Sequence, residues 1–346
     1  MASTGAQTQE YELLAAARAG DEDAFRRLVD PHRAQLHAHC YRMLGSLHDA
    51  EDVLQDALLR AWRGLARFDG RSAVRTWLYR ITTNVCLDAI ARRPKRILPI
   101  DYGSPAASEG DEPETRPVEG VWVEPYPDEL LEIEEGYAAP EARYEQREAV
   151  ELAFVAALQH LSSRQRAVLV LREVLGFTAR EVADALDSTT ASVNSALQRA
   201  RKTVEERIPE RSQQATVRAL GDAEVRKVVG RFGDALERGD TDEILGVLAE
   251  DASFSMPPYP SLFRGRAAIA DSWLMPGGPP PRLRCLPTHA NGQPAVAAYR
   301  LSPDGTRYLP LTLDVLTLRG ASIVHVTAFR TPELFSRFGL PDELAA

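Results

Sequence analysis

Hydrophobic residues recur at spacings of three and four in two parts of the chain, residues 11–93 and 143–208. Leu54 and Leu58 in the first part, and Val193 with the apolar residues that follow it in the second, fall on one side of a helix that turns by about 100° per residue. Each part is therefore predicted to be a set of helices that bury apolar stripes.

The residues between these two parts follow no such period. Residues 94–142 contain eight prolines, several glycines and a run of acidic residues. This composition buries too little apolar surface to offset the entropy lost when a core becomes ordered. We therefore expect an acidic, Pro-rich linker over residues 99–142, which separates a first domain, residues 1–98, from a second, residues 143–212.

The last part of the chain changes from helical to strand-like patterns. After a short polar hinge (Pro209–Thr216), two helical stretches at residues 222–237 and 241–249 precede runs of β-favouring residues, broken by turns such as Pro303–Gly305. Helices followed by a meander of strands predict a separate α+β domain over residues 213–346. The predicted strands are Ala252–Met256, Ala295–Leu301, Tyr308–Leu318 and Ser322–Arg330.

The distribution of charge changes which partners are expected. The formal net charge of the 346 residues is −9, yet residues 101–149 alone hold three Lys and Arg against fifteen Asp and Glu. The remainder is slightly basic, so the overall acidity does not exclude a nucleic-acid partner. No run of about 18 apolar residues occurs, and residues 1–10 lack the basic and apolar segments of a secretory signal. We expect a cytoplasmic protein with no membrane partner.

The cysteines and histidines favour structural roles. Three widely spaced cysteines fit no disulfide framework. Four potential ligands lie close together in sequence, but His39 points away from the side shared by His37 and Cys40, and no second cluster exists. We therefore expect no metal and no cofactor. The four residues are His32, His37, His39 and Cys40.

Residues 177–202 have the pattern of two helices joined by a tight turn. Thr178 and Glu181 form a capping box, Asp187–Thr189 supply the turn, and Thr190 is expected to cap the second helix. A second helix with a small polar outer face is what enters a DNA major groove, whereas an αα-hairpin with a solvated face is the alternative. That outer face comprises Ala191, Ser195, Gln198 and Lys202, flanked by Asn194 and Arg199.

Two further segments of the first domain carry chemistry on outward helix faces. Ser46 caps a helix whose outward side suits a basic partner helix, the alternative being a face that only meets water. Residues 68–93 interleave Arg80, Arg92 and Arg93 with aromatic rings, which suits phosphates and bases of single-stranded DNA, although Trp77 could belong to the core. The outward residues of the capped helix are Asp52, Gln55, Asp56 and Leu59.

Together these segments resemble bacterial sigma-70 family factors of the extracytoplasmic-function group, over about residues 11–208. Residues Asp49–Trp62, then Thr76–Asn84, then the helix-turn-helix that ends with Leu197–Arg201 carry the resemblance in the family's order and spacing. It implies a subunit that is not an enzyme, binds RNA polymerase core and directs it to promoter DNA, both double-stranded and melted. The fold implied is two all-α domains, sigma region two and the region-four helix-turn-helix.

The resemblance also implies a role for each segment. Asp52, Gln55, Asp56 and Leu59 would bind the polymerase core. The residues implied for the minus-ten element are Phe68, Arg71, Ser72, Arg75, Trp77, Arg80, Asn84, Arg92 and Arg93. Those implied for the minus-thirty-five element are Thr190, Ser192, Asn194, Ser195, Gln198, Arg199 and Lys202.

The C-terminal domain resembles the SnoaL-like cone fold, an α+β fold that some sigma factors carry as an extension. In enzymes of that fold Asp and His pairs catalyse acid–base steps; here His289, Asp314 and His325 are the matching residue types, and we expect core roles and no catalytic residue. A regulatory domain is implied, with a small-molecule ligand among its partners.

The acidic linker holds one aromatic, Pro-stiffened stretch, residues 121–129, which resembles the tryptophan–proline motif of sigma factors with SnoaL-like tails. An exposed Trp is unfavourable in a solvated segment, so Trp122 and Tyr126 are expected to dock beside the loop at residues 256–260. Such docking would hold the DNA-binding domains in a fixed, mostly inactive arrangement.

Two rival functions remain. A freestanding helix-turn-helix regulator would bind DNA without polymerase and would have no use for the acidic outward face at Asp52 and Asp56. A cyclase or hydrolase would show a substrate-dependent activity lost on changing Asp314 or His325.

Overall fold

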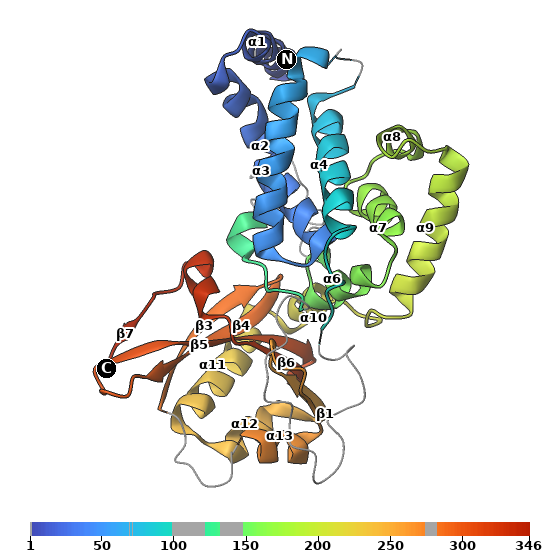
Figure 1. Ribbon diagram of the computed structural model, residues 1–346. Helices are drawn as coiled ribbons and strands as arrows, with labels where there is room; N and C mark the ends of the chain where they lie inside the picture. Colours follow the sequence, from blue (N-terminus) through green and yellow to red (C-terminus); the bar gives the residue numbers. More distant parts are fainter. Residues whose placement is uncertain (1, 69, 71, 99–121, 132–147, 274–281) are drawn as a thin grey trace. The chain divides into compact units, whose positions relative to one another are not determined.

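The computed structural model in Figure 1 describes residues 2–68, 70, 72–98, 122–131, 148–273 and 282–346, in two compact units. The first unit is drawn from residues 1–95, 130–137 and 157–206, and the second from residues 96–129, 138–156 and 207–346. None of the helices in the described part of the chain combines the length and the apolarity that a membrane span requires.

The N-terminal part of the first unit is a set of antiparallel helices. Ser46 begins α3 by accepting a hydrogen bond from the Asp49 amide (3.1 Å), which confirms the predicted cap, and Gly45 ends α2 in the left-handed conformation that glycine adopts without strain. Helix α3 packs against both α2 and α4. The elements are α1 (Ala2–Arg18), α2 (Glu22–Leu44), α3 (Leu47–Gly64), η1 (Leu65–Arg67) and α4 (Val74–Ile90).

The rest of the first unit contains the helix-turn-helix. The predicted capping box is confirmed, because the side chains of Thr178 and Glu181 each accept from the other's backbone amide. The cap of the next helix was predicted one residue too late: extended Thr189, not Thr190, accepts from the Ser192 amide, and Thr190 is already helical. The elements are α7 (Ser163–Leu169), η4 (Val170–Val174), α8 (Ala179–Ala185) and α9 (Thr190–Glu205). Helix α6 (Leu152–Gln159) comes before them and belongs to this unit from residue 157 on.

These two sets of helices pack on each other within the first unit. Helix α7 contacts α2 and α4, and α8 contacts α4. The buried guanidinium of Arg166 donates to the Met43 carbonyl and to Gln159 Oε1 (2.6 Å), which offsets part of the cost of burying its charge. Gln159 in turn donates to the Arg42 carbonyl (3.4 Å).

The second unit is an α+β structure, as predicted. Its sheet has the strand order β2-β1-β6-β5-β4-β3, with β7 on β5; β1 and β6 are parallel and the other pairs antiparallel. Helix α11 covers the face of the sheet that carries Val296, Leu316 and Val326, and its Phe232 is fully buried there. The helices are α10 (Gln213–Leu220), α11 (Asp222–Arg238), α12 (Thr241–Val247) and α13 (Arg266–Trp273), with η5 (Pro332–Phe338). The strands are β1 (Leu248–Ser255), β2 (Leu262–Arg264), β3 (Leu283–Ala290), β4 (Gln293–Leu301), β5 (Arg307–Arg319), β6 (Ser322–Phe329) and β7 (Leu344–Ala345).

The predicted polar hinge at residues 209–216 is wrong in its second half. Ser212 caps helix α10, and the Glu151 carboxylate accepts from the backbone amides of Gln213 (3.0 Å) and Gln214 (2.8 Å). A carboxylate at the first turn satisfies amides that a helix leaves free and interacts favourably with the helix dipole. The helix therefore depends on a residue sixty positions away, which no local pattern predicts.

The linker segment 122–129 belongs to the second unit, although its composition predicted a segment without a core. Trp122 is 5% exposed and Tyr126 fully buried. Ile97 and Trp122 form a parallel bridge, and η3 (Asp128–Leu131) follows. Among the linker residues, 99–121 and 132–142 lie outside the described part of the chain.

Candidate functional site

Helix α3 carries the outward face predicted to bind a basic partner. Val53, Leu54 and Ala57 are buried against the neighbouring helices. The other side carries two carboxylates and Leu59, which is 52% exposed, a large value for a leucine. This surface, called here the α3 surface, consists of Asp52, Gln55, Asp56 and Leu59, all exposed.

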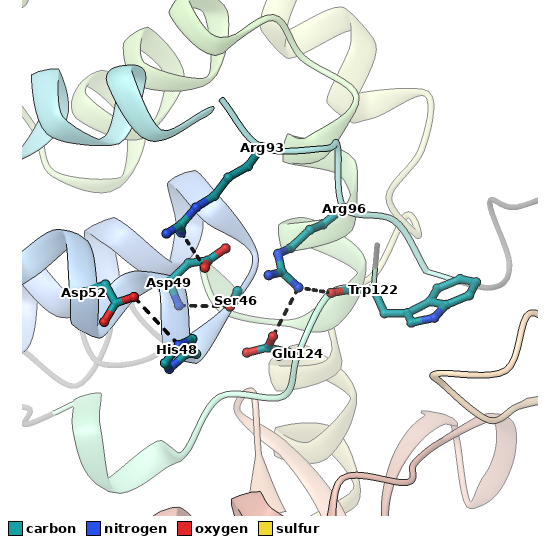
Figure 2. A network of polar contacts seen from close by, with 8 residues as sticks. All are labelled: Ser46, His48, Asp49, Asp52, Arg93, Arg96, Trp122 and Glu124. Atoms are coloured by element: carbon teal, nitrogen blue, oxygen red, sulfur yellow. Dashed lines mark hydrogen bonds and ion pairs between the residues drawn. The ribbon is translucent and has the colours of Figure 1, made fainter. Parts of the chain in front are cut away.

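The start of α3 is fixed by a polar network that Figure 2 shows. Asp49 is buried, its amide bonds to Ser46, and its carboxylate pairs with Arg93. His48 Nε2 lies 3.7 Å from Asp52 at the edge of the α3 surface. Arg93, predicted to contact the minus-ten element, is thus held by the first turn of α3.

An aromatic pair precedes α4. The Phe68 and Trp77 ring centroids lie 4.7 Å apart, and the Arg18 guanidinium lies 5.9 Å from the centroid of the Phe68 ring while it donates to the Phe68 carbonyl. Phe68 is buried and Trp77 half-buried, so of these two residues Trp77 is the more accessible. Ser72 beside them is exposed, whereas Arg71 lies outside the described residues.

Arg75 contacts the helix-turn-helix segment within the first unit. Its guanidinium donates to the Leu175 carbonyl (3.0 Å) and lies over the rings of Phe177 (4.6 Å) and Tyr79 (5.1 Å). These contacts combine a hydrogen bond with cation–π attraction. Arg75, which was predicted to contact minus-ten DNA, therefore contacts the helix-turn-helix, the other predicted DNA-binding element.

The other predicted residues of α4 and its C-terminal end differ in accessibility. Arg80 is exposed and pairs with Asp187 (3.3 Å), in the turn between α8 and α9. Asn84 is half-buried and Arg92 is exposed. On the basic face of α4, Arg80 is thus exposed to solvent, whereas Arg75 contacts the helix-turn-helix.

Helix α9 presents the polar face that the period predicted. Val193, Leu197 and Ala200 are buried on one side. On the other, Arg199 donates to Ser195 Oγ (2.7 Å), which holds the guanidinium along the helix. All seven residues predicted for the minus-thirty-five element are exposed: Thr190, Ser192, Asn194, Ser195, Gln198, Arg199 and Lys202.

The linker segment is fixed in the second unit by its side chains and by backbone contacts. Trp122 Nε1 donates to the Pro258 carbonyl (2.8 Å), and Arg96 donates to the Trp122 carbonyl (2.9 Å) and to Glu124 (3.1 Å), as Figure 2 shows in part. Pro258 lies in the loop named in the sequence-based prediction. Tyr126 packs deeper, fully buried.

Asn291 is a functional candidate that the sequence reasoning missed. Its Oδ1 accepts from the Tyr126 amide (2.8 Å), its amide donates to the Tyr126 carbonyl (2.8 Å), and its Nδ2 donates to the Val150 carbonyl (2.7 Å). One side chain thus joins a residue of the linker to the segment that follows the linker. The signal was the Asn-Gly pair between β3 and β4, which favours a tight hairpin turn.

The three acid–base candidates do not form a common site. Asp314 pairs with Ala328 and His325 with Thr317, so the two side chains lie on opposite faces of the sheet. His325 lies between Ser253 (2.6 Å) and Ser255 (3.2 Å), and burial lowers its pKa to about 4. His289 is exposed on the edge strand β3.

His39 of α2 belongs to the core of the first unit. His39 is fully buried, its Nε2 lies 2.9 Å from Thr83, and burial lowers its pKa to about 3. Across the part of the chain that the structure describes, no group of three His, Cys, Asp or Glu is placed to hold a metal ion.

Comparisons with known proteins match the whole arrangement. Family models match at residues 28–96 (Sigma-70 region 2), 151–204 (Sigma-70, region 4) and 229–328 (SnoaL-like domain). The chain is 43% identical over 330 residues to the ECF RNA polymerase sigma factor SigG of Mycobacterium tuberculosis, which covers 94% of this chain and 86% of that protein. It is 31% identical over 195 residues to SigM of the same organism, covering 56% of this chain and 82% of the relative.

A solved structure shares the fold of most of the chain. The crystal structure of the Mycobacterium tuberculosis extracytoplasmic function sigma factor SigJ aligns with a TM-score of 0.53 at 22% identity, covering 88% of this chain and 95% of that one. The helical N-terminal part followed by an α+β C-terminal part is therefore an arrangement that an experimentally determined structure also has.

Proposed function

Because the chain belongs to the extracytoplasmic-function RNA polymerase sigma factors, which direct the polymerase to promoters, we propose that the α3 surface is where it binds the core enzyme. The observation that carries this proposal is the exposure of all four outward residues of α3, among them Leu59, a large apolar side chain that is 52% exposed. Two carboxylates on the same helix face as an exposed apolar side chain suit a basic helix with an apolar stripe. A freestanding DNA-binding regulator has no use for such a surface.

Promoter DNA is proposed to bind two further surfaces. The exposed face of α9 would contact the minus-thirty-five element through Gln198 and its neighbours, because amide and guanidinium groups form paired hydrogen bonds with base edges. The Arg80 side of α4, with the half-buried Trp77, would contact the melted minus-ten element through phosphate and stacking interactions. The division into domains 1–98, 99–142, 143–212 and 213–346 is proposed on the same basis.

We propose further that the compact first unit is the resting form in the absence of polymerase. Two promoter elements about two DNA turns apart are separated by roughly 70 Å. The contacts of Arg75 with Leu175 and Phe177 hold the two DNA-binding elements together within one unit, so they must break before both elements are bound. The docked linker segment, held by Trp122 and Asn291, would oppose that separation.

The second unit is proposed to be regulatory and not catalytic, in a protein of the cytoplasm. Acid–base catalysis requires a proton donor and acceptor that reach one substrate, and Asp314 and His325 face opposite sides of the sheet. The contacts of its loop and hairpin with the linker support control of the linker as its role.

A charge reversal on the α3 surface tests the core-binding proposal. Asp52→Arg with Asp56→Arg replaces attraction by repulsion against a basic partner, which costs several kcal/mol, while the buried side of α3 is unchanged. We expect pull-down of core polymerase and run-off transcription to be lost. The matched control is Glu10→Arg with Glu12→Arg, two exposed carboxylates of α1 in the same unit, which should retain both activities. Normal core binding by the Asp52 and Asp56 variant would refute the proposal.

A further inference from the structure

Two adjoining cavities lie in the second unit. The first, about 180 Å³, is lined by apolar side chains of the helix-covered sheet face, including Leu236, Phe254 and Leu283. The second, about 570 Å³, lies between the docked linker segment and the loop that follows β1. The two share Arg300, Leu311 and Arg330 as lining residues, so they adjoin at these three side chains. The larger volume lies in the range of small-molecule sites, roughly 300–1,000 Å³.

The apolar cavity contains one polar group in need of a partner. Asp314 lines it, is 2% exposed, and its Oδ1 forms no hydrogen bond with the described residues. Buried polar atoms are almost always hydrogen-bonded, because an unsatisfied one costs about 1–3 kcal/mol. Burial raises the pKa of Asp314 to about 7, although a hydrogen bond with Thr312 acts in the opposite direction. A protonated carboxyl can donate a hydrogen bond to a carbonyl or ether oxygen.

The shared wall of the two cavities is basic. The Arg330 guanidinium lies 5.5 Å from the centroid of the Tyr259 ring, and Arg300 is exposed on β4. Arg96 and Glu124, which also line the larger cavity, pair with each other at 3.1 Å. That leaves Arg300 and Arg330 against one exposed carboxylate, Glu333, a surplus of positive charge suited to a carboxylate.

We propose that the two cavities form one binding site for a small amphipathic organic anion. The carboxylate of the ligand pairs with Arg300 and Arg330, its apolar body lies against Leu236 and Phe254, and a carbonyl or ether oxygen at its far end accepts a hydrogen bond from Asp314. The ligand class is thus a cyclic or aromatic monocarboxylate with an oxygen acceptor opposite the acid group.

The position of Trp122 connects this site to regulation, and this step rests on the proposed role of the linker. Trp122 and Val123 line the larger cavity together with Pro258, whose carbonyl accepts the indole N–H. A ligand that touches the docked linker stabilises docking, and docking raises the ligand's affinity by the same factor.

A matched pair of probes tests the site in the full-length chain without polymerase. The probe 6-acetyl-2-naphthoate carries the carboxylate, the apolar body and the carbonyl, and 2-acetylnaphthalene lacks the carboxylate. By isothermal titration calorimetry we expect the acid to bind at least tenfold more tightly than the neutral ketone. Arg330→Gln and Arg300→Gln should each weaken the acid at least tenfold, whereas Arg307→Gln, an exposed arginine of β5 paired with Glu343, should leave its affinity unchanged.

The acceptor end is tested separately. The probe 2-naphthoate lacks the acetyl group, so wild-type protein should bind 6-acetyl-2-naphthoate more tightly than 2-naphthoate. Asp314→Asn should keep that preference, because its amide also donates a hydrogen bond. Asp314→Leu should abolish the preference. No binding of 6-acetyl-2-naphthoate at millimolar concentration, or equal affinity in the Arg330→Gln and Arg307→Gln proteins, would overturn the site. These outcomes do not involve core polymerase, so they are independent of the α3 test. If Trp122→Ala binds the acid as tightly as wild type does, ligand binding is not coupled to docking of the linker. The binding site itself would still hold.

Discussion

Burial decides the protonation of several side chains in the second unit, even where hydrogen bonds oppose it. Glu151 accepts two backbone amides at the start of α10, which favours its charged form, yet burial raises its pKa to about 7. Asp314, in an apolar cavity with fewer donors, is raised to about 7 as well. Removing solvent from a carboxylate outweighs one or two hydrogen bonds to it.

The raised pKa of Asp314 predicts how stability depends on pH. In the unfolded chain this group titrates near 3.8, so between about pH 4 and pH 7 the folded state holds a proton that the unfolded state has lost, and stability falls as pH rises through this window. The asparagine side chain in Asp314→Asn cannot ionise, so this variant does not lose stability as the pH rises. We expect the variant to be more stable than wild type at pH 8, by up to about 4 kcal/mol, with the difference vanishing near pH 4 in denaturant unfolding.

Asp304 provides a control of opposite sign. Hydrogen bonds from Ser302 and Thr306 lower its pKa to about 2, so its contribution is present above about pH 4 and is lost as pH falls through 2. Asp304→Asn should therefore be slightly less stable than wild type at pH 7. If Asp314→Asn and Asp304→Asn showed the same pH profile, burial would not be the cause of the Asp314 effect.

Single residues of α9 separate sequence recognition from general affinity. In the holoenzyme, Gln198→Ala should cost roughly 1–3 kcal/mol at one base position of the minus-thirty-five element and little elsewhere. Lys202→Ala should weaken all sequences alike and reduce the salt slope by about one. Arg201→Ala is the matched control, because Arg201 pairs with Glu173 (2.7 Å) and contributes less net charge. Promoter binding measured across salt concentrations distinguishes the three, and a uniform loss for Gln198→Ala would exclude base recognition.

Local elements were predictable where the residues that cap and bury them all lie in one short segment. The caps at Ser46 and Thr178 and the buried stripe of α9 involve residues within a few positions of each other. Strand β3 was missed because it lies at the edge of the sheet and contains Pro287, and α10 was missed because Glu151 stabilises its start from a distance. The exposed faces of α3, α4 and α9 were likewise predictable. The contacts that α4 makes with the helix-turn-helix through Arg75 and Arg80 were not.

Arg75 illustrates that difference between a face and its contacts. Its position on α4 follows from the period, whereas its contacts lie one hundred residues away at Leu175 and Phe177. Arg75→Ala should loosen the packing of α8 on α4 by about 1–2 kcal/mol, the sum expected of a hydrogen bond and a cation–π contact. Hydrogen exchange of α8 amides in the free chain should accelerate about tenfold. Arg80→Ala, which removes only an exposed pair with Asp187, should change it much less, and equal effects would contradict the assignment.

At the scale of the whole molecule, the second unit holds the chain on both sides of residues 132–147. Trp122 and Tyr126 come before the undescribed residues 132–147, and Val150 and Leu152 come after them. Asn291 bonds to Tyr126 and to Val150, while Gln293 accepts from the Leu152 amide (3.1 Å). One hairpin, β3–β4, therefore holds the chain on both sides of this stretch, and release of the linker requires these contacts to break together with those of Trp122.

Replacing Trp122 should favour release of the docked linker. Trp122→Ala removes a buried indole and its hydrogen bond to Pro258, a loss of about 3–5 kcal/mol for the docked state. We expect run-off transcription to change in the same direction as in a chain that ends at Ser212, though by less, because Asn291 still holds Tyr126. Core binding should be unaffected in both. The fluorescence of Trp122, obtained as the difference between wild type and Trp122→Phe, should be shielded from a soluble quencher only when residues 213–346 are present; equal quenching in both chains would show that the linker does not dock.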